Sequence, residues 1–193
     1  MKNLLHVASN TVGRGVYPQQ MAWLLEAPWR RLLTSPARHA VFLELKAHWE
    51  VLEVGSGSGY FSLEVARRLP QGRLELFDLQ AEMLHKAKRK MSAENLVNAG
   101  YTQGDAARLP FAEKRFDLVY MANVLGEIED RAACLQSIRR VLKDEGRLSI
   151  TEHRTDPDYV PIAELGALLK SAGFRRKIFA PRCWAYTAVF EKG

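Results

Sequence analysis

The stretch Val51–Gly59 has the residue types of a ligand-binding turn. Its sequence is VLEVGSGSG, so an apolar run with one carboxylate, Glu53, leads into Gly55, Gly57 and Gly59. Glycine allows the backbone to turn sharply and to approach a ligand without a side-chain clash. The pattern predicts either a small ligand bound against the backbone, or a tight turn between a strand and a helix that binds nothing.

Three other glycine motifs are excluded by the same residues. No Lys-Ser or Lys-Thr pair follows Gly59, so the turn is not a phosphate-binding P-loop. The middle position of the five is Gly57 rather than serine, which excludes the nucleophile elbow of hydrolases. The glycines are spaced as GxGxG, whereas the dinucleotide fingerprint is GxGxxG.

Two further carboxylates follow later apolar runs. Asp78 ends the run 73–78, about 20 residues beyond the glycines, where a carboxylate can bind both ribose hydroxyls of an adenosine-type ligand. Its alternative role is to cap the next helix. Asp105 follows Gly104 and can accept a hydrogen bond from an exocyclic amine such as adenine N6. Gly-Asp is also an ordinary turn, so this pair alone is a weaker signal.

Alternating strand and helix patterns must position these residues. We predict strands at 50–54, 73–78, 100–104, 116–121 and 147–152, and helices at 60–69, 81–91, 130–141 and 162–172. Lys143 and Gly146 are expected to mark the end of the helix at 130–141. Two more strands, 174–179 and 184–191, flank Pro181. The alternation predicts an α/β fold with a mostly parallel sheet, which binds ligands at the carboxyl ends of its strands.

The first part of the chain lacks this alternation. Residues 21–33 and 37–46 have helical spacing of apolar residues, and we expect helices there. The chain has 193 residues with 47% apolar content, which suits one compact core and leaves no room for a second catalytic domain. We therefore expect a single domain over 1–193, with helices in 1–48 and an α/β core in 49–193.

Four stretches together resemble the class I methyltransferases that depend on S-adenosylmethionine (SAM). The resemblance covers about half of the chain and implies a Rossmann-like three-layer sandwich. It also implies a seven-stranded, mostly parallel sheet whose last strand is antiparallel. The stretches are 53–59, Asp78-Leu79 with Met83-Leu84, 104–111, and 116–119 leading into Asn123-Val124-Leu125.

The resemblance also implies roles for individual residues. Glu53 and the backbone around the glycines would hold the methionine end of SAM, Asp78 the ribose, and Asp105 the adenine N6. Residues 17–33 look like the N-terminal helical cover of the ubiquinone/menaquinone-type branch, and would close over the cofactor. The complete expected cofactor set is Glu53, Gly55, Ser56, Gly57, Gly59, Asp78, Leu79, Met83, Asp105, Ala106 and Asn123.

The sequence also departs from parts of the family. The ubiquinone/menaquinone-type branch often carries histidine where this chain has Gly126-Glu127. No Asn-Pro-Pro-Tyr or Asp-Pro-Pro-Tyr stretch follows the strand at 116–121, which disfavours the enzymes that methylate amino groups of bases or of glutamine side chains.

Methyl transfer from a sulfonium is an in-line displacement in which the protein mainly aligns an acceptor and excludes water. A general base is needed only if the acceptor must lose a proton. The candidates are Glu127, which is equally a solvated carboxylate at a helix start, His153, which is first expected in a surface loop, and Tyr17, which would reach in from the N-terminal segment.

Composition limits the partners. The net charge is +6, but the basic residues are scattered, so a nucleic-acid partner is possible and not favoured. Cys134 and Cys183 form no CxxC or Cys/His pair, so no metal is expected, and they are too few for an arsenic methyltransferase. Isolated cysteines and the lack of a long apolar run suit a cytoplasmic protein without a membrane span. No motif specifies an oligomeric state.

The sequence thus predicts an enzyme that transfers a methyl group from SAM to a small-molecule acceptor of unknown identity, releasing S-adenosylhomocysteine (SAH). Two alternatives stay open. One is a methyltransferase for RNA or protein, which the positive charge motivates. The other is a protein that binds SAM or SAH without catalysis, which the lack of an evident base motivates.

Overall fold

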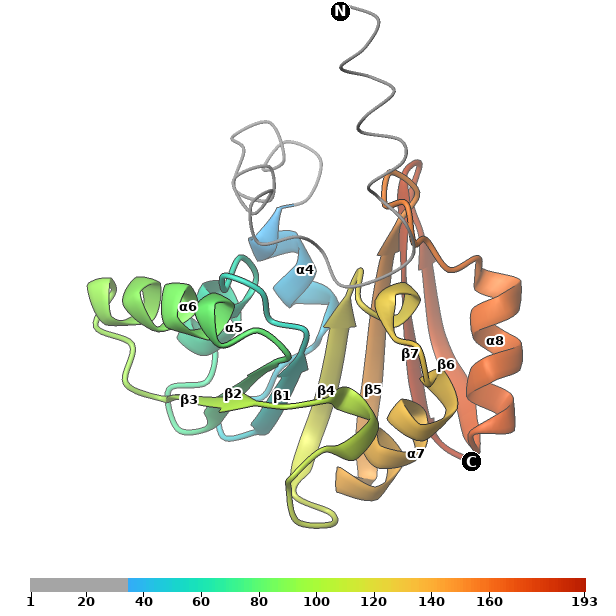
Figure 1. The fold of residues 1–193 in the computed structure, drawn as a ribbon, viewed down its shortest axis with the longest axis horizontal. Coiled ribbons are helices and arrows are strands. Elements are labelled where there is room, and N and C mark those ends of the chain that lie inside the picture. Colours follow the sequence, from blue (N-terminus) through green and yellow to red (C-terminus); the bar gives the residue numbers. More distant parts are fainter. Residues whose placement is uncertain (1–34) are drawn as a thin grey trace, which may run out of the picture.

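A computed structural model describes residues 35–193, which form one seven-stranded sheet covered by helices on both faces (Figure 1). The order across the sheet is β3-β2-β1-β4-β5-β7-β6, and β7 runs antiparallel to the other six strands. The predicted α/β sandwich with an antiparallel last strand is confirmed. The strands are β1 (Glu50–Val54), β2 (Arg73–Asp78), β3 (Ala99–Gln103), β4 (Phe116–Ala122), β5 (Leu142–His153), β6 (Phe174–Pro181) and β7 (Ala185–Lys192).

The helices form the two outer layers, each over its own apolar core. One layer contains α4 (Pro36–Phe42), α5 (Ser62–Arg67) and α6 (Ala81–Ala93), and the other contains α7 (Arg131–Val141) and α8 (Ile162–Ser171). Strand β4 contributes to both cores because alternate side chains point to opposite faces. Leu118 and Tyr120 pack in the core under α4, α5 and α6, while Val119 and Met121 pack in the core under α7 and α8. Both faces of the central strands are therefore buried, as parallel sheets require.

The order of the strands reverses at β1, which lies between β2 and β4. The loops that follow β1 and β4 begin next to each other and lead to helices on opposite faces of the sheet, which leaves a crevice between them. A crevice at such a switch point is where open α/β sheets bind ligands. The fold therefore places the glycine turn and the loop after β4 side by side.

Two predicted boundaries are wrong. The helix predicted at 37–46 ends at Phe42, because the chain turns there and Glu44 takes a left-handed backbone conformation with φ of 47°. Lys143 and Gly146 do not separate α7 from a later strand. Strand β5 begins at Leu142, which pairs with Phe116, and after a bulge the ladder continues with Arg147 opposite Leu118.

The expected helix at 21–33, Tyr17 and most of the expected N-terminal cover over 1–48 lie outside the described residues. Within residues 35–193, no helix is both long and apolar enough to cross a membrane.

Candidate cofactor site

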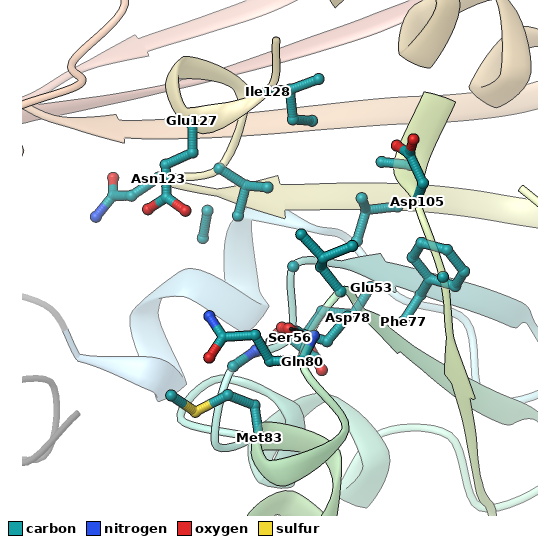
Figure 2. A pocket seen from close by; sticks show the side chains of 18 of the residues that line it. Glu53, Ser56, Phe77, Asp78, Gln80, Met83, Asp105, Asn123, Glu127 and Ile128 are labelled. Atoms are coloured by element: carbon teal, nitrogen blue, oxygen red, sulfur yellow. Dashed lines mark hydrogen bonds between the residues drawn. The ribbon is translucent and has the colours of Figure 1, made fainter. Parts of the chain in front are cut away.

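A cavity of about 460 Å³ lies at the carboxyl ends of β1, β2 and β4 (Figure 2). It is enclosed by the loops that follow these strands, by the loop after β3 and by the first turn of α6. Most of the residues expected to bind a cofactor line it together: Glu53, Gly55, Ser56, Gly57, Asp78, Leu79, Met83, Asp105, Ala106 and Asn123.

The three glycines of the turn all have positive φ but different surroundings. A Cβ at Gly55 would lie 2.4 Å from the Val124 side chain, whereas a Cβ at Gly57 would meet nothing within 4 Å. Gly59 does not line the cavity, and a Cβ there would lie 3.0 Å from Ala87 of α6. Gly55 and Gly59 therefore allow close packing, while Gly57 presents bare backbone to the cavity.

Asp78 is fixed by the backbone of two loops. Its Oδ2 accepts a hydrogen bond from the Gly57 amide at 2.7 Å, and its Oδ1 accepts one from the Gln80 amide at 2.9 Å. Burial raises the pKa of its carboxyl, and these hydrogen bonds act in the opposite direction. The N-cap of α6 is Gln80 rather than Asp78. The carboxylate thus joins the glycine turn to the start of α6.

Glu53 is buried at the floor of the cavity, with 3% of its surface exposed. The Ser62 hydroxyl donates a hydrogen bond to it. Burial raises the pKa of Glu53 to about 8, Ser62 and Tyr120 act to lower it, and the neighbouring Asp78 raises it. No Lys or Arg in residues 35–193 forms an ion pair with Glu53. The ammonium group of a bound ligand would therefore stabilise the ionised form of this carboxyl.

Asp105 lies at the outer edge of the cavity. Its side chain is exposed, and Oδ1 caps a short 3-10 helix by accepting a hydrogen bond from the Ala107 amide at 2.9 Å. Leu79 also lines the cavity and is 51% exposed. Asp105, which the resemblance assigns to adenine N6, and Leu79 thus both lie on the accessible part of the cavity wall.

Asn123 has its side-chain oxygen engaged by the protein. It follows β4 with φ of 56°, and its Oδ1 accepts a hydrogen bond from the His153 amide at 2.9 Å and lies 2.8 Å from His153 Nδ1. Figure 2 shows Asn123 and Glu127 together on one side of the cavity, with Gln80 and Met83 across from them. The amide thus ties the end of β4 to the end of β5.

His153 is not in a surface loop, so that part of the sequence prediction is wrong. It is the last residue of β5, is 8% exposed, and does not line the cavity. Its backbone pairs with β7, because β5 continues further than the apolar pattern indicates. Tyr17 lies outside the described residues, and of the other two candidate bases Glu127 lines the cavity and His153 does not.

The cavity is acidic although the chain is basic. Seven carboxylates line it, and no Lys, Arg or His is among its described lining residues. This contrasts with the net charge of +6 for the whole chain. Beyond β4 only Glu127 was predicted from the sequence; Glu129 and Asp130 were not, although they lie in the same acidic run at 127–130, and nothing in the sequence near Asp156 indicates its place in the cavity. The carboxylates are Glu53, Asp78, Asp105, Glu127, Glu129, Asp130 and Asp156.

Comparisons with known proteins identify the family of the chain. A family profile described as "Methyltransferase domain" matches residues 51–146. The chain is 35% identical over 118 residues to the ubiquinone/menaquinone biosynthesis C-methyltransferase UbiE of Haemophilus ducreyi, covering 60% of this chain and 45% of the relative. It is 32% identical over 126 residues to a demethylmenaquinone methyltransferase of Lactobacillus johnsonii, covering 64% and 51%. The chain belongs to the class I SAM-dependent methyltransferases.

Solved structures support the fold over more of the chain. A SAM-dependent methyltransferase from Aquifex aeolicus superposes with a TM-score of 0.85 at 21% identity, covering 91% of this chain and 98% of that one. The methyltransferase CalH in complex with SAH has a TM-score of 0.68 at 19% identity, covering 80% and 54%. The chain spans about half the length of the curated relatives it matches.

The cavity has features that suit SAM. SAM carries a net positive charge, from a sulfonium and an ammonium against one carboxylate, and the cavity wall is acidic. The open backbone at Gly57 allows close approach, and the buried Glu53 lacks a cationic partner within the described residues. We therefore infer that SAM binds in this cavity.

Proposed function

We propose that this protein catalyses methyl transfer from SAM to a small, uncharged or cationic acceptor. The observation that carries the proposal is the acidic cavity at the switch point of the sheet, in which Asp78 is fixed by Gly57 and Gln80. Bound SAM supplies its sulfonium methyl group. The bond between the methyl carbon and sulfur breaks as the bond to the acceptor forms, and SAH is the product that remains.

The residues of the chain bind and orient both reactants. The Asp78 carboxylate would bind the ribose diol, and Glu53 and the Gly55–Gly57 backbone would bind the amino-acid end of SAM. Leu79 and Met83 supply apolar contact for the adenine. The donor would thereby be held with its sulfonium toward the loop after β4, so that an acceptor entering beside Asn123 and Glu127 meets the methyl group in line.

Proton removal would be needed for a carbon acceptor. Glu127 lines the cavity and can serve as the base. His153 lies behind Asn123, and its ring is oriented by Asn123 Oδ1. We assign His153 a positioning role, because it does not reach the cavity wall.

The charge of the cavity selects among acceptors. An acceptor with phosphate or carboxylate groups would be repelled by the ionised carboxylates of the cavity wall, which has no lining cation among the described residues; Glu53, with its raised pKa, contributes least to this repulsion. This disfavours RNA. A reduced quinone ring is uncharged, and the curated relatives named above are C-methyltransferases of quinone biosynthesis. A quinol that lacks its ring methyl group is therefore the first acceptor to test.

The direct experiment measures methyl transfer and SAM binding in parallel. We expect the full chain to form methylated product from labelled SAM and a reduced demethylnaphthoquinone under anaerobic conditions. Binding of SAM measured by calorimetry should weaken about 100-fold in Asp78→Ala, because charged hydrogen bonds contribute about 1.5–3 kcal/mol each.

Two results would contradict the proposal in different ways. Unchanged SAM binding in Asp78→Ala would remove the assigned cofactor site. Tight SAM binding without turnover on uncharged or cationic acceptors would favour a protein that binds SAM without catalysis. Lys114→Ala is a suitable control, because its exposed ion pair with Asp144 lies at the other end of the sheet.

A further inference from the structure

An exposed group of basic and apolar side chains lies where α4 meets the turn between β6 and β7. Arg38, Val41 and Phe42 are spaced for one face of α4. The Arg182 guanidinium lies 4.3 Å from the centre of the Phe42 ring. Trp184 is in the same turn and is 64% exposed, as is Val41.

Arg154 joins this group through the backbone. Its amide donates a hydrogen bond to the Trp184 carbonyl at 2.8 Å, so the residue after β5 is attached to the β6–β7 turn. Arg154 directly follows His153, which holds Asn123 at the wall of the cavity. We call the set the arginine–tryptophan surface: Arg38, Val41, Phe42, Arg154, Arg182 and Trp184.

The arginines of this surface lack counter-charges. The side chains of Arg38, Arg154 and Arg182 form no ion pair within residues 35–193. Burial, and to a smaller degree the Arg38 guanidinium, lower the pKa of Arg182. Elsewhere seven exposed or partly exposed arginines form an ion pair with a carboxylate; they are Arg67, Arg68, Arg73, Arg115, Arg131, Arg147 and Arg175.

Exposure of the apolar side chains to water is unfavourable, and their combination with unpaired cations matches the polar–apolar boundary of a bilayer. Tryptophan is favoured at the boundary between lipid headgroups and acyl chains, and arginine is attracted to anionic headgroups. We propose that the arginine–tryptophan surface binds anionic lipid bilayers and thereby places the neighbouring mouth of the cavity against the membrane surface.

A lipid surface explains features that a nucleic acid does not. Val41 and Trp184 are two large apolar side chains that are each 64% exposed, and insertion into a bilayer would remove both from water. A polyanion that bound the arginines would extend toward a cavity lined by carboxylates. An uncharged, lipid-soluble acceptor would instead pass directly from the bilayer to the cavity. The proposal concerns binding alone and stands whether or not turnover is found.

Sedimentation with vesicles tests the proposal. The full chain is mixed with vesicles of phosphatidylcholine and phosphatidylglycerol in equal parts, and separately with phosphatidylcholine alone, at physiological salt. We expect binding to the mixed vesicles only. The triple variant Arg38→Gln, Arg154→Gln and Arg182→Gln should bind about 100-fold more weakly, from about fivefold for each arginine. Trp184→Ser should also weaken binding, without any change in charge.

Matched variants separate this surface from net charge. Arg67→Gln, Arg73→Gln and Arg175→Gln remove the same charge from arginines that carboxylates already neutralise, and should bind within about threefold of the parent. Val97→Ser removes an apolar side chain that is 93% exposed elsewhere and should have no effect. Equal losses in both triple variants would overturn the proposal. So would the absence of binding to mixed vesicles, binding of RNA in their place, or self-association through Trp184.

Discussion

The two sides of the cavity are built in different ways. On the cofactor side, which comprises the loops after β1, β2 and β3, the polar groups are carboxylates that accept hydrogen bonds from backbone amides, across up to 21 positions of the chain. The bonds from Gly57 and Gln80 to Asp78 are the example. On the acceptor side, which comprises the loops after β4 and β5, the Asn123 side chain is bonded to His153, 30 positions away.

This difference decides how each side depends on its residues. The cofactor side presents backbone, so its function depends on glycines that keep side chains out. The acceptor side presents side chains that hold the ends of two strands together, so its function depends on long-range pairing. Residues on the acceptor side can therefore be replaced without changing how SAM is bound. This is consistent with one fold that serves many methyl acceptors.

The largest expected effect comes from adding one methyl group to the glycine turn. In Gly57→Ala the new Cβ would have no protein neighbour within 4 Å and would occupy space needed by the ligand. We expect SAM affinity to fall about 10- to 100-fold, because overpacking costs about 1–3 kcal/mol. Calorimetric titration with SAM measures this directly.

Gly59→Ala is the matched control. It shares the positive φ and its strain of about 1–2 kcal/mol, but its Cβ would press on Ala87 rather than enter the cavity. We expect lower stability with SAM affinity within about threefold of the parent. A loss of affinity that is as large in Gly59→Ala would show that the turn acts through packing alone.

A smaller effect is expected from the acceptor side. Asn123→Gly keeps the left-handed backbone and removes both contacts with His153. We expect turnover to fall about tenfold, since a misplaced acceptor loses much of its alignment, while SAM affinity stays within about twofold. Steady-state kinetics and SAM titration separate the two quantities.

Asn95→Gly provides the comparison for this variant. Asn95 also has φ of 56°, but it follows α6 and does not line the cavity. Asn95→Gly should leave turnover and SAM affinity unchanged. A parallel loss of turnover and of SAM affinity in Asn123→Gly would contradict the division of the cavity into two sides.

Sequence reasoning succeeded where contacts are local. The glycine spacing, the position of Asp78 after β2 and the alternation of strands and helices are set by neighbouring residues, and the structure brings these positions to one cavity. The same reasoning identified ten residues of its cofactor set that line the cavity, with Gly59 as the exception. Gly59 resembles the other glycines in sequence, and only the packing of α6 distinguishes it.

Apart from the end of α4, which a local turn at Glu44 sets, the failures involve contacts between distant segments. Nothing near His153 in the sequence indicates that β7 pairs with it or that Asn123 binds it. The extra residues 143–146 are absorbed into β5 by a bulge, which the pairing with β4 determines. The burial of Glu152 and His39 likewise follows from the assembled sheet. The acceptor side is made mostly of such contacts, so the sequence predicts it less well.

The smallest expected effect concerns a buried carboxyl behind the acceptor side. Glu152 is 1% exposed, and burial raises its pKa to about 8. The folded protein therefore keeps the proton that the unfolded chain releases near its ordinary value of 4.5. The stability that the protonated Glu152 carboxyl gives to the folded state is fully present below pH 4.5 and is lost as the pH rises to about 8. The loss amounts to about 1 kcal/mol between pH 7 and pH 8.

Glu152→Gln keeps the shape of the side chain and removes its titration, so its stability should fall less steeply with pH than that of the parent. Urea denaturation at several pH values from about 7 to 8 measures the difference. His39 does not interfere, because burial lowers its pKa to about 3, and its stabilising effect is complete above pH 6.5. Glu53 on the cofactor side has a similarly raised pKa. Saturating SAM should lower the pKa of Glu53 and remove its contribution to the slope of stability against pH, while the contribution of Glu152 should persist. Identical slopes in the parent and in Glu152→Gln would refute the assignment to Glu152.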